Sequence, residues 1–198
     1  MLTHNFYLSR TNESMIPGLP DDLALRCLAM ISHGYHGLLE SVSKKWRRAV
    51  RSMDYANLKA KEGWCGNWLL VSTHVGHKSQ WNAYDPDADR WHSLPRLPKA
   101  DCESLSGCSC VSVCKRFLVI GGCYSSPFRG HLGTTDVMMF DPFKQQWSRV
   151  SNMRTARNNF ACAVILDKVY VAGGNSSSAT GGLSAAEVYD PNMDRYYM

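Results

Sequence analysis

The residues with the greatest chemical potential in this sequence are its eight cysteines and seven histidines. Thiolate and imidazole groups bind zinc when they occur in closely spaced pairs such as Cys-x-x-Cys. Five cysteines fall between positions 102 and 123, but the spacing of Cys108, Cys110 and Cys114 does not provide such pairs. We therefore expect no zinc site, and we interpret the cysteines as reduced thiols that are mostly buried.

A copper centre or a catalytic carboxylate pair would be the next candidates. Copper needs His, Tyr or Cys ligands that converge on one point, whereas the histidines are dispersed and the His74-x-x-His77 pair lies in a predicted loop. The acidic residues Asp85, Asp141 and Asp190 recur in step with a repeat, which indicates turns. The sequence contains neither a serine nucleophile elbow nor a glycine-rich phosphate loop. We expect a non-catalytic protein without a metal or cofactor.

The charge distribution argues against nucleic acid and membrane as partners. The net charge is +5, and one short stretch concentrates basic residues at Lys44, Lys45, Arg47, Arg48 and Arg51. Such a run usually forms a solvated helix face, and the other basic residues are scattered. No apolar run is long enough to predict a transmembrane helix. Residues 1–15 lack the apolar centre of a signal peptide, and we expect them to form a disordered arm.

The acidic turns belong to a unit that occurs three times. Each copy reads aromatic-Asp-Pro, with a second aromatic residue seven positions after the first: Tyr84-Asp85-Pro86 with Trp91, Phe140-Asp141-Pro142 with Trp147, and Tyr189-Asp190-Pro191 with Tyr196. The aspartate and the proline favour a turn. The residues before each turn are apolar or alternating, which is typical of a strand. Each copy therefore predicts a β-hairpin with an aromatic residue on each arm.

A second element keeps step with these hairpins. An apolar strand at 117–120 ends in Gly121-Gly122, and a strand at 169–172 ends in Gly173-Gly174, 52 residues later. A glycine pair after a buried strand indicates that the backbone bends where no side chain fits. Together with the hairpins this predicts about four strands per period, which is the content of one β-propeller blade.

This pattern, at a period near fifty, resembles the kelch repeat, in which each repeat forms one four-stranded blade. The first repeat departs from the family pattern, because its strand at 68–71 has no glycine pair. The resemblance implies structural kelch positions at Gly121, Gly122, Phe140, Asp141, Trp147, Gly173, Gly174, Tyr189 and Asp190.

The resemblance also bears on residues outside these positions. It implies that the arginines at Arg154 and Arg157 satisfy backbone carbonyls between strands or blades. The loops after the glycine pairs are candidates for substrate contact, since recognition residues often lie on loops. Within them Tyr124, Arg129 and His131 are weak candidates for which a solvated loop is the better interpretation.

Residues 16–53 predict three short amphipathic helices with a small core. The segment begins with Leu19-Pro20-Asp21-Asp22-Leu23 and ends with Val42-Ser43-Lys44-Lys45-Trp46-Arg47. Both ends resemble the F-box. The resemblance implies an adaptor-binding surface to which Trp46 contributes either directly or as part of the core. The residues that face or support this surface are Leu19, Pro20, Leu23, Leu28, Val42 and Trp46.

An F-box before kelch repeats is similar to the plant-type F-box/kelch proteins. The resemblance implies a substrate-recognition subunit of an SCF-type ubiquitin ligase. Its F-box would dock on a Skp-type adaptor, and through it on a cullin, while the kelch blades bind a protein substrate. It also implies a cytoplasmic or nuclear location. The alternatives are a kelch scaffold or cytoskeletal protein and, more remotely, a kelch-fold oxidase.

The predicted architecture is a multidomain α and β protein. A small three-helix F-box precedes antiparallel four-stranded kelch blades in an incomplete propeller. Its parts are a disordered arm (1–15), the F-box (16–53), a linker (54–66) and kelch repeats (67–198). Under three repeats are too few to close a ring, so we expect a fragment or shortened product of a longer protein. Its open strand edge and uncovered blade face would favour aggregation or pairing.

Overall fold

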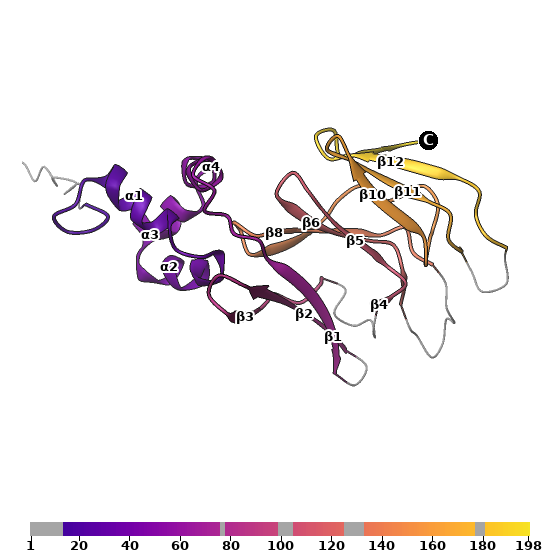
Figure 1. Cartoon of the computed structure of the whole chain (residues 1–198), viewed down its shortest axis with the longest axis horizontal. Coiled ribbons are helices and arrows are strands. Elements are labelled where there is room, and N and C mark those ends of the chain that lie inside the picture. Colours follow the sequence, from indigo (N-terminus) through magenta and orange to yellow (C-terminus); the bar gives the residue numbers. More distant parts are fainter. Residues whose placement is uncertain (1–13, 76–77, 99–104, 125–132, 177–180) are drawn as a thin grey trace, which may run out of the picture. The chain divides into compact units, whose positions relative to one another are not determined.

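The computed structural model describes residues 14–75, 78–98, 105–124, 133–176 and 181–198. The chain divides into two compact units, Met1–Gly66 and Asn67–Met198 (Figure 1). The first unit is helical and the second is built from antiparallel sheets. Most of the predicted disordered arm lies outside the described residues. None of the helices in the described ranges is long and apolar enough to cross a membrane.

The helical unit contains short helices whose starts follow from local chemistry. Asp21 and Asp22 lie in the first turn of α1, where carboxylates favour the positive end of the helix dipole. The hydroxyl of Ser43 accepts a hydrogen bond from the Trp46 amide at 3.0 Å and so caps α3. The helices are α1 (Asp21–Ala29), the 3-10 turn η1 (His33–Tyr35), α2 (His36–Val42), α3 (Lys44–Val50) and α4 (Met53–Lys61).

The helix α4 corrects the prediction of three helices followed by a linker. It begins after Ser52, whose hydroxyl accepts a hydrogen bond from the Tyr55 amide at 3.2 Å. It packs against α1, and its buried Lys59 side chain donates from Nζ to the carbonyls of Ala29 and Ile31 at 2.8 and 2.7 Å. The lysine thus satisfies carbonyls at the end of α1 that have no partner within that helix. The fourth helix therefore completes the core of this unit.

The second unit contains three consecutive larger sheets, here called blades 1, 2 and 3, and one short two-stranded sheet. Blade 1 contains β1 (Leu69–Val75), β2 (Lys78–Asp85) and β3 (Arg90–Ser93). Blade 2 contains β5 (Ser109–Val113), β6 (Arg116–Ile120), β8 (Val137–Asp141) and β9 (Gln146–Arg149). Blade 3 contains β10 (Ala161–Ile165), β11 (Lys168–Ala172), β12 (Ala186–Asp190) and β13 (Arg195–Tyr197). The strands β4 (Leu105–Ser106) and β7 (Cys123–Tyr124) pair with each other.

The predicted fold class is confirmed. Every strand of a blade is antiparallel to its neighbour in chain order. Blades 2 and 3 have four strands each, blade 1 has three, and the described part of the chain contains no closed ring. Two buried clusters form the core, one between blades 1 and 2 and the other between blades 2 and 3. Figure 1 shows blade 2, with β5, β6 and β8, between the other two.

The hairpin turns have the structure that their aspartates suggest. Oδ1 of Asp141 accepts hydrogen bonds from the amides of Phe143 and Lys144 at 2.9 and 3.1 Å. Asp85 and Asp190 accept bonds from the amides two residues later in the same way. The two aromatic rings of each copy lie 4.9–5.1 Å apart between centroids. The turns therefore place one aromatic pair in each blade.

The glycine pairs lie where the backbone has positive φ and little space. Gly121 has φ of 58°, and a Cβ there would lie 2.7 Å from the Arg157 carbonyl oxygen. The Gly122 amide donates to that same carbonyl at 2.8 Å. A side chain at Gly121 would therefore push the chain that leads into blade 3 away from blade 2.

The predicted burial of the cysteines is wrong for most of the described ones. All of them are free thiols, but only Cys123 is buried, while Cys27, Cys110 and Cys114 are exposed. Cys114 lies in the β5–β6 turn with φ of 48°, which places it at the surface whatever its hydrophobicity.

Candidate functional site

The six predicted adaptor-binding residues fall into three levels of burial. Pro20, Leu23 and Val42 are exposed, although two of them are large apolar side chains. Leu19 and Trp46 are half-buried. Leu28 belongs to the core, so it can support a binding surface but cannot touch a partner.

Contacts with residue Met15 hold the start of the helical unit against α3. The indole Nε1 of Trp46 donates to the Met15 carbonyl at 2.7 Å, and the Met15 amide donates to Oδ1 of Asp21 at 2.7 Å. Nζ of Lys45 lies 2.7 Å from Oδ2 of the same aspartate. These bonds to Lys45 and Met15 lower the pKa of Asp21. The structure therefore brings Trp46 and the Leu19-Pro20 turn into one locally fixed region, and Met15 is part of it rather than of a disordered arm.

Sequence reasoning missed further exposed apolar side chains of the helical unit. They add to Leu23 and Val42, and they are Met30, Leu38 and Met53. These five exposed side chains are the apolar groups of the unit that a partner could cover. Met30 and Met53 lie at helix ends, where periodicity carries little information.

A small buried polar network connects three helices of the unit. The Tyr55 hydroxyl on α4 lies 3.2 Å from the Leu28 carbonyl of α1 and 2.8 Å from Nε2 of His36 on α2. All three residues are buried. The ring of His33 packs edge-on against His36, and burial lowers the pKa of His33 to about 2. Both histidines are therefore core residues of the helical unit.

The basic stretch of α3 is only partly neutralised. Arg51 forms a bidentate pair with Glu40, at 2.8 and 2.6 Å, which raises the pKa of Arg51. Lys45 pairs with Asp21. Lys44 and Arg48 are exposed. The helix therefore presents positive charge to solvent.

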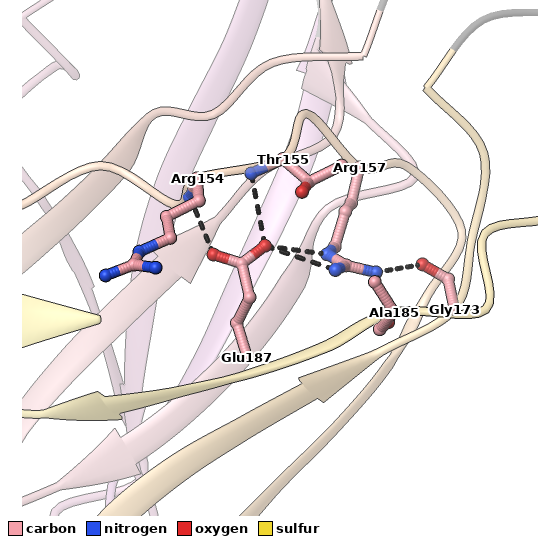
Figure 2. Close-up of polar contacts among 6 residues, drawn as sticks. All are labelled: Arg154, Thr155, Arg157, Gly173, Ala185 and Glu187. Carbon is pink, nitrogen blue, oxygen red and sulfur yellow. Dashed lines mark hydrogen bonds and ion pairs between the residues drawn. The ribbon is translucent and has the colours of Figure 1, made fainter. Parts of the chain in front are cut away.

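The predicted role of Arg157 in the kelch unit is confirmed. Its Nη1 donates to the carbonyls of Gly173 and Ala185 at 2.8 and 2.9 Å. Its Nε and Nη2 donate to Oε1 of Glu187 at 3.3 and 3.1 Å, and both side chains are fully buried (Figure 2). Arg154 differs from the prediction, because its side chain is exposed and only its amide bonds to Glu187.

The Arg157–Glu187 pair connects two blades. The backbone of Arg157 bonds to blade 2, since its amide donates to Thr134 and its carbonyl accepts from Gly122. The side chain bonds to blade 3 through Gly173 and Glu187. Glu187 itself also accepts from two backbone amides, those of Arg154 and Thr155 (Figure 2). The pair therefore acts as a buried structural clamp in which each nitrogen of the guanidinium and each carboxylate oxygen has a hydrogen bond, which is what makes a buried ion pair tolerable.

The weak candidates for substrate contact gain no support. Arg129 and His131 lie outside the described residues. Tyr124 lies in β7, where it pairs with Leu105 and is half-buried. No group of three or more metal-binding side chains occurs within the described ranges.

Comparison with known proteins finds two families in this chain. The F-box domain matches residues 16–56, and the kelch motif matches residues 104–154 and 156–197. These segments coincide with the helical unit and with blades 2 and 3. Blade 1 lies outside both kelch matches, in keeping with its missing fourth strand and glycine pair.

Similar proteins from Arabidopsis thaliana share this combination. The F-box/kelch-repeat protein At1g16250 is 55% identical over 190 residues, which cover 93% of this chain and 49% of the relative. The F-box/kelch-repeat protein SKIP30 is 36% identical over 95% of this chain and 54% of its own length. The chain thus spans about half the length of these relatives.

A solved structure supports the fold alone. The structure of YjhT matches 65% of this chain with a TM-score of 0.52 at 13% sequence identity. The match covers 49% of that protein.

Proposed function

Because this chain belongs to the F-box/kelch-repeat proteins, we propose that it is a substrate-recognition subunit of an SCF-type ubiquitin ligase. The F-box docks on a Skp-type adaptor, which links it to a cullin. The kelch blades hold a protein substrate for ubiquitination. The subunit itself is non-catalytic and works in the cytoplasm or the nucleus.

The observation that carries this proposal is the exposed apolar surface of the F-box unit. Leu23, Leu38 and Val42 come from α1 and α2 and remain exposed after the unit has folded. Amphipathic helices that present apolar anchors commonly dock into a partner's groove. The exposed basic side chains of α3 would favour an acidic partner and speed the encounter.

The kelch unit supports the general idea of a substrate-binding surface on its loops, but it does not identify the substrate. Its interior residues are committed to holding blades together, as the Arg157–Glu187 pair illustrates. Recognition therefore falls to the loops between strands, which can vary without disturbing the blade frame. A surface built from several such loops is better suited to binding a protein substrate than a single deep catalytic site would be.

The test is calorimetric titration of the full chain with a purified Skp-type adaptor. We expect the variant Leu23→Ala/Val42→Ala to bind at least about tenfold more weakly, because buried anchors supply most of the binding energy of an interface. Both side chains are exposed, so their truncation leaves the core intact. The matched control is Leu166→Ala, which truncates an exposed leucine of the kelch unit and leaves binding unchanged.

The opposite result has a definite meaning. A folded wild-type chain that does not bind the adaptor would overturn the ligase role and favour a kelch scaffold protein. Equal loss of binding in the control variant would show that the effect is not specific to the F-box surface.

A further inference from the structure

The predicted adaptor-facing residues come from two segments that lie far apart in the sequence. Leu19, Pro20 and Leu23 belong to the turn before α1 and to the start of that helix. Val42 and Trp46 lie at the end of α2 and in α3. A partner that binds both segments needs them in one fixed arrangement, and ordering them during binding would cost free energy. The contacts between the two segments therefore decide how large that cost is.

The first segment contains a tight turn with its own internal bond. The Leu19 amide donates to the Ile16 carbonyl at 3.0 Å, and Pro17 and Gly18 lie between them. Gly18 has φ of 79°, which is close to the value that the third residue of a type II turn requires. The turn therefore has a defined shape, but its internal bond does not fix its position relative to α3.

Two contacts with α3 fix that position, and together we call them the latch. Before the turn, the Met15 carbonyl accepts a hydrogen bond from Nε1 of Trp46, and after the turn, Oδ2 of Asp21 pairs with Nζ of Lys45, each at 2.7 Å. Oδ1 of Asp21 also accepts from the Met15 amide at 2.7 Å. The carboxylate thus ties the two ends of the turn to each other, and the latch ties both ends to neighbouring residues of α3.

We propose that the latch positions the turn for the adaptor, which makes Asp21 and Lys45 positioning residues of the F-box. This inference rests on the proposed function. The side chains of Lys45 and Asp21 are 36% and 46% exposed, so water competes for the pair, and an open pair releases the turn. An adaptor that binds a released turn must order it again, which weakens the complex. Variants of one interface differ mostly in dissociation rate, so an intact latch should slow dissociation.

Simple attraction to an acidic adaptor would give a different pattern of effects. Through charge alone, removal of the Lys45 ammonium would slow association, whereas removal of the Asp21 carboxylate charge would speed association and tighten binding. The latch predicts that both changes weaken the complex, because each one breaks the same pair. The direction of the effect at Asp21 therefore separates the two explanations.

The test is the kinetics of adaptor binding by the full chain, measured by surface plasmon resonance with a purified Skp-type adaptor. We expect Lys45→Met and Asp21→Asn each to dissociate about two- to fivefold faster than the wild type, which is the range for an exposed ion pair. The double variant should dissociate no faster than either single variant, because the pair is already broken. Lys45→Arg keeps the charge and should dissociate as slowly as the wild type.

The matched control is Lys44→Met, which removes an exposed charge from the same helix. It should slow association and leave the dissociation rate unchanged. A second measurement examines the latch without the adaptor. Hydrogen exchange of the Leu19 amide in the free chain should be faster in Lys45→Met and unchanged in Lys44→Met, because a released turn opens more often.

Failure of the latch and failure of the proposed function give different results. A folded wild-type chain that does not bind the adaptor would overturn the proposed function and the latch with it. A chain that binds, but whose Asp21→Asn variant dissociates as slowly as the wild type, would overturn the latch alone. Additive effects of the two substitutions in the double variant would do the same, because they would show that Asp21 and Lys45 act independently.

Discussion

Blades 2 and 3 meet their preceding blades through the same two positions, yet with opposite chemistry. Between blades 2 and 3 these positions hold Arg157, which precedes β10, and Glu187 of β12, and the two form a buried ion pair. Between blades 1 and 2 the counterparts are Leu105 of β4 and Met138 of β8, which belong to a buried apolar cluster. Strand register makes Met138 the counterpart of Glu187, because Met138 pairs with Val119 as Glu187 pairs with Val171. It makes Leu105 the counterpart of Arg157, because the next residues pair in step, Ser106 with Cys123 and Asn158 with Asn175.

The difference shows that the fold requires a filled interface there and does not require charge. An apolar pair stabilises through burial and packing alone. A buried ion pair must offset the cost of removing two charges from water, so its geometry has to be complete. Arg157 meets that condition by donating to two carbonyls as well as to Glu187. The polar clamp is therefore more sensitive to single substitutions than its apolar counterpart.

The largest expected effect comes from breaking the ion pair on one side. Glu187→Ala should lower the free energy of unfolding of the kelch unit by about 3–5 kcal/mol, because it leaves a buried guanidinium without its counter-charge. Urea denaturation followed by tryptophan fluorescence measures this. Arg154→Ala is the control and should change stability by less than about 0.5 kcal/mol, because that side chain is exposed.

The double variant Arg157→Leu/Glu187→Met copies the apolar pair of blade 2 and sharpens this prediction. It should be less destabilised than Glu187→Ala alone, because no unpaired charge remains. Part of the loss should persist, since the carbonyls of Gly173 and Ala185 lose their guanidinium donor. A double variant that is less stable than Glu187→Ala would contradict the view that the interface needs filling rather than charge.

The helical unit also buries a titratable group, the neutral imidazole of His33. Burial lowers the pKa of His33 to about 2, below the ordinary value of 6.5. Between these values the unfolded chain binds a proton that the folded chain does not. The free energy of unfolding should therefore fall by up to about 1.4 kcal/mol per pH unit as pH drops below about 6.5.

Urea denaturation of the full chain at about pH 7.5 and about pH 5, followed by the helical circular dichroism signal, measures this loss. The variant His33→Gln removes the titrating group and should reduce the dependence on pH. A dependence that is unchanged in this variant would assign the acid sensitivity to other groups.

A smaller effect distinguishes the second aromatic residue of the two blades. Nε1 of Trp147 donates to the Pro95 carbonyl at 2.8 Å, so Trp147→Phe should cost about 1–3 kcal/mol through the lost bond and the lost volume. The hydroxyl of Tyr196 is buried and has no hydrogen-bond partner among the described residues. Tyr196→Phe should therefore leave thermal stability unchanged or raise it slightly. Equal losses of stability in Trp147→Phe and Tyr196→Phe would contradict the view that only the Trp147 side chain contributes a hydrogen bond.

Much of the kelch unit could be predicted from sequence, because local chemistry specifies it. An aspartate before a proline favours a turn wherever it occurs, and Asp85, Asp141 and Asp190 all form one. Positive φ at Gly121 likewise follows from a residue type. The role of Arg157 followed from family resemblance, but its partner Glu187 did not, because the two lie 30 residues apart.

The unpredicted parts depend on tertiary context. The region of helix α4 was predicted as a linker, because its only buried long side chains are Tyr55 and Lys59 and a lysine argues against a core position. The exposed cysteines reflect their strand and turn positions rather than their hydrophobicity. The adaptor-binding residues remain predictions, since burial shows that Leu28 cannot touch a partner but does not show what Leu23 touches.

The Arg157–Glu187 clamp also sets an order of events while the chain is being made. Arg157 leaves the ribosome 30 residues before Glu187. At about 5–20 residues per second, the arginine waits roughly 2–6 s for its counter-charge. During that interval the backbone of Arg157 can already join Thr134 and Gly122, but its guanidinium remains in water. All residues of blade 2 are therefore synthesised before its interface with blade 3 can form. That interface is completed only when β12, which carries Glu187, has been synthesised.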